Sequence, residues 1–109
     1  MDPFLQQFNK AAHLLIDQDK IGIEQLCNQM DMSRSQIHRK VKTLTGSSTS
    51  LLIRNIKLEK ARELLGRTDL SITEVAHRCR IKSLQNMSKY FSREYGMSPT
   101  QYRLEQHSK

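Results

Sequence analysis

The polar residues between Arg34 and Lys42 are of types that bind nucleic acid. This stretch carries four cationic side chains and no carboxylate. An arginine can donate two parallel hydrogen bonds to guanine, and Ser, Gln and His can hydrogen-bond other base edges. Ile37, Val41 and Leu44 recur at helical spacing and are expected to face a core. The predicted exposed face is therefore made of Arg34, Ser35, Gln36, His38, Arg39 and Lys42. Of these, Arg39 suits guanine, Ser35, Gln36 and His38 suit secondary base contacts, and Arg34 and Lys42 suit phosphates.

A second stretch repeats this pattern at an offset of fifty positions. Ser33, Ile37, Val41 and Gly46 align with Ser83, Met87, Phe91 and Gly96, and the match continues upstream at an offset of 49 through Ile23/Ile72, Leu26/Val75 and Cys27/Ala76. The change of offset falls in a turn, where chains tolerate insertions best. The exposed face of the second copy is predicted as Leu84, Gln85, Asn86, Ser88, Lys89 and Arg93. Gln85 and Asn86 suit adenine edges, and Leu84 suits a thymine methyl group.

The alternative to a binding role is that each polar residue belongs to an ordinary solvated helix surface. For one residue that interpretation is the better one, but for the set it is improbable, because two repeats place polar and cationic groups on the same helical face. The aromatic side chains are interpreted in the opposite way, as core residues and not as base-stacking platforms: Phe4, Phe8, Tyr90, Phe91, Tyr95 and Tyr102.

The elements that must position these residues are all predicted to be helices. The expected fold is all-α, with about seven helices and two helix-turn-helix subdomains joined by a long linker helix. The predicted divisions are a lead-in helix in residues 1–20, a first helix-turn-helix in 21–47, a linker helix in 48–66, and a second helix-turn-helix with a C-terminal helix in 67–106. Ser33, Ser48, Ser71, Ser83 and Ser98 are expected to cap helices, and Gly46 and Gly96 to end them. Leu51, Leu58, Ala61 and Leu65 are expected to share one face of the linker helix, and residues 106–109 to fray.

Composition excludes several classes of protein. The net charge is +7, distributed as −3 over residues 1–32, +7 over 33–67 and +3 over 68–109, which favours an anionic partner. Cys27 and Cys79 form no CxxC pair, and the four histidines lack metal-ligand spacing, so neither a metal site nor a cofactor is expected. No apolar run has membrane-spanning length. We expect a soluble, cytoplasmic protein that is not an enzyme, since no nucleophile, base and orienting group recur together.

With these residues in place, the chain resembles the DNA-binding region of the AraC/XylS family of bacterial transcription regulators. The resemblance rests on Met32-Ser33-Arg34-Ser35 with Arg39 and Lys42, on Arg54-x-x-Lys57-Leu58-x-x-Ala61 and on Ile72-x-x-Val75-Ala76. Its strongest part is Ser88-Lys89-Tyr90-Phe91-Ser92 followed by Gly96-Met97-Ser98-Pro99-x-x-Tyr102-Arg103. The family usually has glycine where this chain has Asp31 and Arg80. An arginine there would be strained if the turn needs a positive φ.

The resemblance implies sequence-specific binding of promoter DNA by a transcription regulator, an activator more often than a repressor. It implies base contacts by Ser35, His38 and Arg39 and by Leu84, Gln85, Asn86 and Lys89. It also implies RNA polymerase as a partner, and a longer parent chain with a sensing or receiver domain, against the alternative of a small stand-alone regulator. The alternative function is a helical protein-protein interaction module that does not bind DNA.

Overall fold

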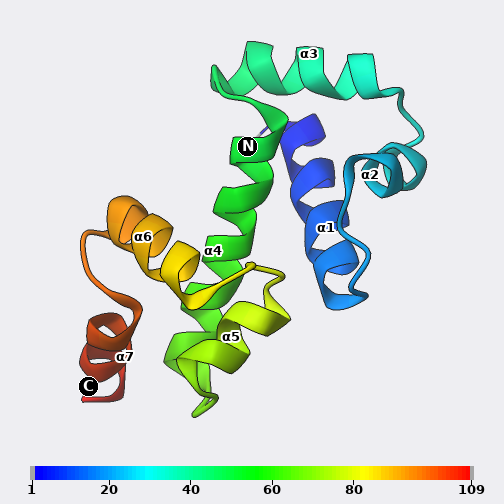
Figure 1. Cartoon of the computed structure of the whole chain (residues 1–109). Coiled ribbons are helices and arrows are strands. Elements are labelled where there is room, and N and C mark those ends of the chain that lie inside the picture. The colour runs from blue at the N-terminus through cyan, green and yellow to red at the C-terminus, as the bar shows by residue number, and fades with distance from the viewer. Residues whose placement is uncertain (1, 109) are drawn as a thin grey trace. The chain divides into compact units, whose positions relative to one another are not determined.

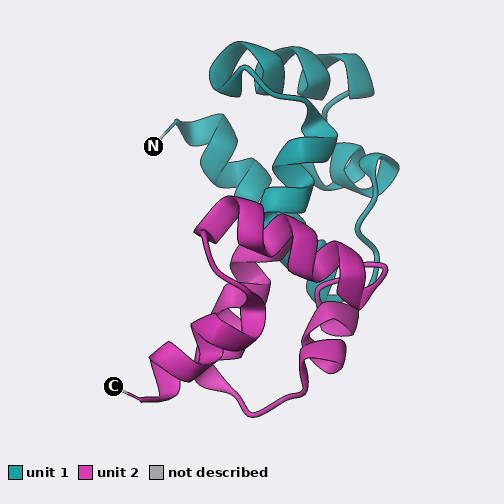
Figure 2. Ribbon diagram, turned by 60° about the vertical axis from the view of Figure 1, so that its left-hand side comes forward, with its two compact units in different colours: residues 1–56 teal, residues 57–109 magenta. Residues whose placement is uncertain are grey.

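The computed structural model describes residues 2–108, which form α-helices without any strand (Figure 1). The prediction of an all-α fold is confirmed. In chain order the helices are α1 (Pro3–Asp17), α2 (Ile23–Met30), α3 (Arg34–Thr45), α4 (Thr49–Arg67), α5 (Ile72–Arg78), α6 (Leu84–Tyr95) and α7 (Pro99–His107). They divide into two compact units, residues 1–56 and 57–109, which share α4 (Figure 2).

Local hydrogen bonds set the ends of the helices as the sequence predicts. At five helix starts a serine hydroxyl accepts a hydrogen bond from the amide three residues later, at Ser33, Ser48, Ser71, Ser83 and Ser98. At Ser33 the capping box is complete, because its own amide donates to Gln36 Oε1 at 2.9 Å. Gly46 and Gly96 end α3 and α6 with φ of 73° and 75°, a conformation that only glycine adopts without cost.

The core of unit 1 is built from α1, α2, α3 and the first half of α4. Its buried residues are Phe4, Phe8, Ala11, Ala12, Leu15, Ile16, Leu26, Met30, Ile37, Val41 and Ile56. The prediction that Leu44 belongs to this core is wrong, since its side chain is 42% exposed. Leu44 lies in the last turn of α3, just before Gly46 ends the helix. The buried residues of α3 are Ile37 and Val41, in the preceding turns.

The core of unit 2 is built from the second half of α4 with α5, α6 and α7. Its buried residues are Leu58, Ala61, Leu65, Val75, Ala76, Cys79, Met87 and Phe91. The Phe91 ring packs edge-on against Tyr95 and Tyr102, with centroid distances of 4.7 and 5.8 Å. Helix α7 continues to His107, so the prediction of fraying from Gln106 is wrong for Gln106 and His107, while Lys109 lies outside the described residues.

Helix α4 buries different faces in the two units. In unit 1 it contributes Ile56 and the flanking Leu52 and Ile53, whereas in unit 2 it contributes Leu58 and Ala61. At about 100° per residue these two sets lie about half a turn apart around the helix. Leu51 lies on the same face as Leu58 and Leu65, as predicted, since seven residues make nearly two full turns. It is nevertheless 38% exposed, because that face is buried only in the part of α4 that belongs to unit 2.

The turn of each helix-turn-helix contains a non-glycine residue with positive φ. Asp31 ends α2 at φ 53°, and Arg80 follows α5 at φ 59°. The expectation that this position needs the left-handed region is confirmed for both. Cys79 is fully buried and Cys27 partly buried, and neither forms a disulfide. Within the described residues no helix is both long and apolar enough to cross a membrane.

Candidate nucleic-acid interface

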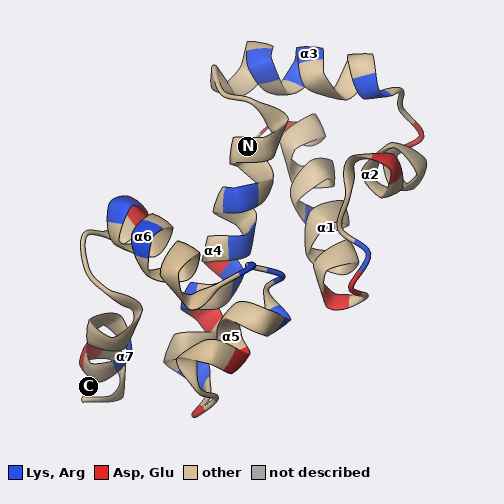
Figure 3. Cartoon of the chain, viewed as in Figure 1, with Lys and Arg blue, Asp and Glu red and all other residues tan. Residues whose placement is uncertain are grey.

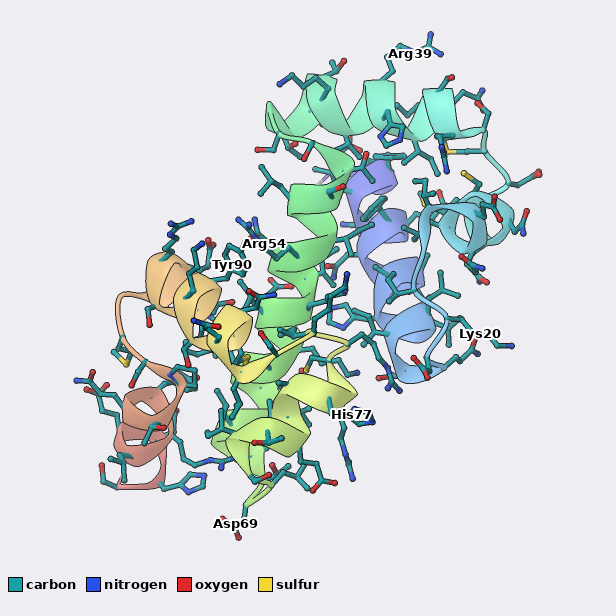
Figure 4. The ribbon with its side chains drawn as sticks, in the orientation of Figure 1. Lys20, Arg39, Arg54, Asp69, His77 and Tyr90 are labelled. Carbon is teal, nitrogen blue, oxygen red and sulfur yellow. The ribbon has the colours of Figure 1, made fainter. Side chains whose placement is uncertain are left out.

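The buried pair Ile37 and Val41 sets the orientation of α3. Both side chains have no exposed surface, and at 100° per residue the direction opposite to them is that of Arg39. The Arg39 side chain projects away from the rest of unit 1 (Figure 4). Ser35, four residues before Arg39, and Thr43, four residues after it, are also exposed and share this outward stripe. The sequence interpretation missed Thr43, although its spacing from Arg39 was a sufficient signal.

A second stripe of α3 lies beside the outward one. Two of its residues contact the turn after α3 and the first residue of α4. The stripe contains Arg34, His38 and Lys42, spaced four residues apart. The His38 Nδ1 atom lies 2.7 Å from Thr49 Oγ1. The Lys42 ammonium donates to the Gly46 carbonyl at 3.0 Å. Two members of this stripe are therefore oriented by the chain itself, which the sequence did not reveal.

Two further residues of α3 have intramolecular partners. Gln36 is exposed, but its Oε1 atom accepts the hydrogen bond from the Ser33 amide that completes the capping box. This leaves the carboxamide NH2 group for an outside partner. Lys40 was not among the predicted site residues, and its ammonium lies 5.6 Å from the centroid of the Phe4 ring, at the start of α1.

Helix α6 repeats the arrangement of α3 within unit 2. Met87 and Phe91 are fully buried, and Lys89 lies opposite to them with Gln85 and Arg93 on the same stripe. The Lys89 ammonium and the Arg93 guanidinium lie 5.5 and 5.9 Å from the centroid of the Tyr90 ring. This ring therefore holds both cations near each other by cation-π attraction.

The remaining predicted residues of α6 lie at its first turn. Leu84 is 44% exposed, and Asn86 is half-buried. Because Ser83 Oγ accepts from the Asn86 amide at 3.0 Å, the first turn of α6 is held in place. The structure thus gathers the first set of predicted residues on α3 of unit 1 and the second set on α6 of unit 2.

Within unit 1, positive charge is concentrated on α3. Lys and Arg are spread along α3, which carries no Asp or Glu (Figure 3). Most carboxylates of unit 1 lie on α1, α2 and the turns that follow these two helices, away from the face of Arg39. Such a separation of charge provides an anion-binding surface on α3.

Two titratable groups of unit 2 have shifted pKa values. Burial lowers the pKa of the Lys57 ammonium, and the nearby charge of Lys82 acts in the same direction. Burial raises the pKa of the Tyr95 hydroxyl, against the effect of the Arg62 guanidinium, which lies 4.6 Å from the ring centroid. Neither group belongs to the outward stripes, so both shifts describe the scaffold that carries α6. Within the described residues no cluster of three or more potential metal ligands is present.

Known proteins are similar to this chain in sequence and in fold. Residues 26–105 match a family described as a helix-turn-helix domain. The HTH-type transcriptional activator RhaS of Escherichia coli strain K12 / DH10B is 31% identical over 85 residues, which are 78% of this chain and 31% of RhaS. The chain therefore spans less than a third of the length of such curated relatives.

Two solved structures superpose on nearly the whole chain. The DNA-binding domain of the global transcriptional factor AdpA, solved in complex with a target DNA, has a TM-score of 0.76 at 30% identity and covers 99% of this chain and 96% of that one. The xylose-binding transcription activator XylR has a TM-score of 0.80 at 32% identity and covers 94% of this chain and 27% of that one.

Proposed function

Because this chain belongs to the AraC/XylS family of helix-turn-helix transcription regulators and binds DNA sequence-specifically, we propose that α3 and α6 each read one segment of the major groove. One observation carries the proposal. In both helices a cationic side chain stands opposite a fully buried apolar pair, Arg39 opposite Ile37 and Val41, and Lys89 opposite Met87 and Phe91. Side chains that point directly away from the core are those that reach the floor of the groove.

For α3, the outward stripe supports base contacts by Arg39 and Ser35, with Thr43 added to them. Arg39 can donate a bidentate pair to guanine O6 and N7. Gln36 contributes through its NH2 group alone, because its oxygen is engaged at the capping box. The lateral stripe of Arg34, His38 and Lys42 faces the walls of the groove, where the phosphates lie, so we assign phosphate contacts to it.

For α6, Gln85 and Lys89 occupy the positions of Ser35 and Arg39. Gln85 and Asn86 offer amide groups that pair with adenine N6 and N7, and the exposed Leu84 offers an apolar contact to a thymine methyl group. Arg93 lies one turn beyond Lys89, and both charges lie near the Tyr90 ring, so we assign Lys89 to a base or phosphate acceptor and Arg93 to a phosphate.

The test is the shape of the DNA target. Because the two recognition helices are repeats along one chain, a monomer should bind an asymmetric or direct-repeat-like site, with half-sites roughly 10 to 10.5 base pairs apart. Selection from random duplexes followed by hydroxyl-radical footprinting measures this. Two protected segments support the proposal. A single short footprint, or a palindromic optimum bound by a dimer, contradicts it.

We also propose that the chain acts as an activator together with RNA polymerase, as part of a longer protein with a sensing or receiver domain. The support is that RhaS and XylR, both activators by name, are each more than three times as long as the matched segment, which covers 31% and 27% of them. In vitro transcription from a selected promoter should rise when the chain is added. Repression, or no change with promoter occupancy verified by footprinting, would contradict the role of activator.

A further inference from the structure

Thr49 is a buried polar residue at the start of α4. It is 3% exposed, and no other polar or charged residue among those described is buried. Its hydroxyl oxygen lies 2.7 Å from Nδ1 of His38, eleven residues earlier on α3. Within the part of the chain that the structure describes, this hydroxyl makes no other hydrogen bond.

The burial of Thr49 decides which atom carries the proton in this pair. If Nδ1 of His38 held the proton, the Thr49 oxygen would accept it and its own hydroxyl proton would be buried without an acceptor. An unmade hydrogen bond of a buried donor costs more than an unused lone pair on an oxygen. We therefore assign the donor role to the hydroxyl, with Nδ1 of His38 as the acceptor and the ring proton on Nε2.

The Nε2 edge of His38 lies on the opposite side of the ring from the contact with Thr49. The residue is exposed, and its Nδ1 edge is turned inward to Thr49, so that the opposite edge of the ring faces solvent. His38 lies on the lateral stripe with Arg34 and Lys42, one residue away from the outward Arg39. An N–H group at that position points to the wall of a groove and not to its floor.

We propose that Thr49 is a positioning residue that fixes His38 as a neutral donor, whose Nε2–H group binds a phosphate oxygen at the edge of the first half-site. The proposal rests on the proposed role of α3 as a recognition helix. It reassigns His38 from a reader of bases to a group that sets how deeply and at what angle α3 enters the groove.

The second repeat lacks the residues of this hydrogen bond and so provides an internal control. At the same offset of fifty positions, His38 is replaced by Ser88 and Thr49 by Pro99. Pro99 is also buried at the first position of its helix, but it has no side-chain donor. The buried position is thus shared by the two repeats, whereas the pairing of a hydroxyl with an imidazole is confined to the first.

The experiment is a double-mutant cycle in the full chain, with Thr49→Val, His38→Ala and the double variant. Valine has nearly the shape of threonine without the hydroxyl, and Thr49→Ser serves as the conservative variant that restores it. Ser88→Ala, on α6, is the matched control. The affinity for a selected duplex is measured for each variant, and melting temperatures and circular dichroism verify that each is folded.

We expect His38→Ala to weaken specific binding about fivefold, the worth of one hydrogen bond. Thr49→Val should weaken it less, about twofold, because part of the imidazole population keeps its proton on Nε2. The double variant should bind no more weakly than His38→Ala, because Thr49 acts through His38. Thr49→Ser should bind like the wild type. Thr49→Val should weaken binding as much in the Ser88→Ala background as in the wild type, since the control site is independent.

Two further readouts test the chemistry. Long-range proton–nitrogen NMR should show the His38 proton on Nε2 in the wild type and a mixture of tautomers in Thr49→Val. A neutral methylphosphonate placed at each phosphate of the first half-site in turn should, at one position, abolish the difference in affinity between the wild type and His38→Ala.

The proposal is overturned if Thr49→Val weakens binding equally in the His38→Ala background, if the proton is on Nδ1, or if no methylphosphonate position abolishes the difference. In those cases Arg39→Ala should still reduce sequence preference, and the proposed function of α3 stands. If the wild type shows no preference for any duplex sequence, it is the proposed function that fails.

Discussion

The ammonium of Lys57 on α4 donates a hydrogen bond of 3.0 Å to the main-chain carbonyl of Arg80, in the turn before α6. Arg80 is the residue of this turn with a φ of 59°, in the left-handed region. The helix that both units share thus fixes a strained turn of unit 2 through a main-chain atom. Because the acceptor is a carbonyl, the hydrogen bond does not depend on the side chain at position 80.

Replacing Arg80 with glycine should raise the stability of unit 2. A residue with a β-carbon in the left-handed region costs roughly 1–2 kcal/mol, and the greater freedom of glycine in the unfolded chain offsets part of this. Among the contacts that the arginine side chain makes, the one from Arg80 Nη1 to the His77 carbonyl is long, at 3.4 Å, and contributes little. We therefore expect a gain of about 0.5–1 kcal/mol, measured by denaturant unfolding.

Asp31→Gly is the matched variant in unit 1, where φ is 53°. Its gain should be smaller, because aspartate tolerates the left-handed region better than arginine. A melting temperature that falls in Arg80→Gly would show that the arginine side chain stabilises the turn by more than its backbone strain costs.

The lowered pKa of Lys57 predicts a particular dependence of stability on pH. The folded protein releases this proton at a lower pH than the unfolded chain, whose ammonium has the ordinary pKa of 10.5. Between the lowered value and 10.5 the unfolded state binds more protons, so the free energy of unfolding contributed by Lys57 rises with pH. The difference in that free energy between the wild type and Lys57→Met should increase across this window.

Lys57→Arg is the control for this measurement, because arginine keeps its charge throughout the range. Its difference from Lys57→Met should not rise in the window. Subtracting variants in this way also removes the contribution of Tyr95, whose raised pKa acts in the opposite direction above pH 10. A wild-type difference that decreases with pH would contradict the assigned effect of burial.

Replacing Arg39 or Lys42 with alanine should affect DNA binding in different ways. Arg39 points outward from α3, so Arg39→Ala should cost on the order of 1–3 kcal/mol of specific binding and relax one base preference. Lys42 lies on the lateral stripe with its ammonium at the Gly46 carbonyl, so Lys42→Ala should weaken all duplexes about equally. Binding to a panel of single-base variants measures both. Equal losses on specific and random DNA for Arg39→Ala would contradict its role as a base contact.

Affinity for DNA should depend steeply on salt. Log affinity is expected to fall by about 0.9 for each phosphate neutralised per unit of log salt. With Arg34, Lys42 and Arg93 assigned to phosphates, replacing any one of them with alanine should reduce the steepness of this slope by about 1. A titration from low to moderate ionic strength checks this, and an unchanged slope in Arg34→Ala would remove that residue from the phosphate contacts.

The sequence by itself determined those features that depend on a few neighbouring residues. The capping box of Ser33 and Gln36 and the stop at Gly46 were predictable because each involves atoms within one helical turn. The left-handed φ of Arg80 was expected from the family resemblance, because the family usually has glycine at that position. The direction of Arg39 followed from the periodicity of Ile37 and Val41, because a single buried stripe determines the opposite face of a helix.

Tertiary structure decided which residues outside the buried stripe are exposed, and which partners they have. Periodicity does not say which neighbouring element covers the flank of a helix, so the exposure of Leu44 and of Leu51 could not be predicted. Nor could the partners of His38 and Lys57, since each bond joins residues on different elements, 11 and 23 positions apart. Such bonds depend on how helices cross and on which buried group lacks a partner, and only the packed chain settles both.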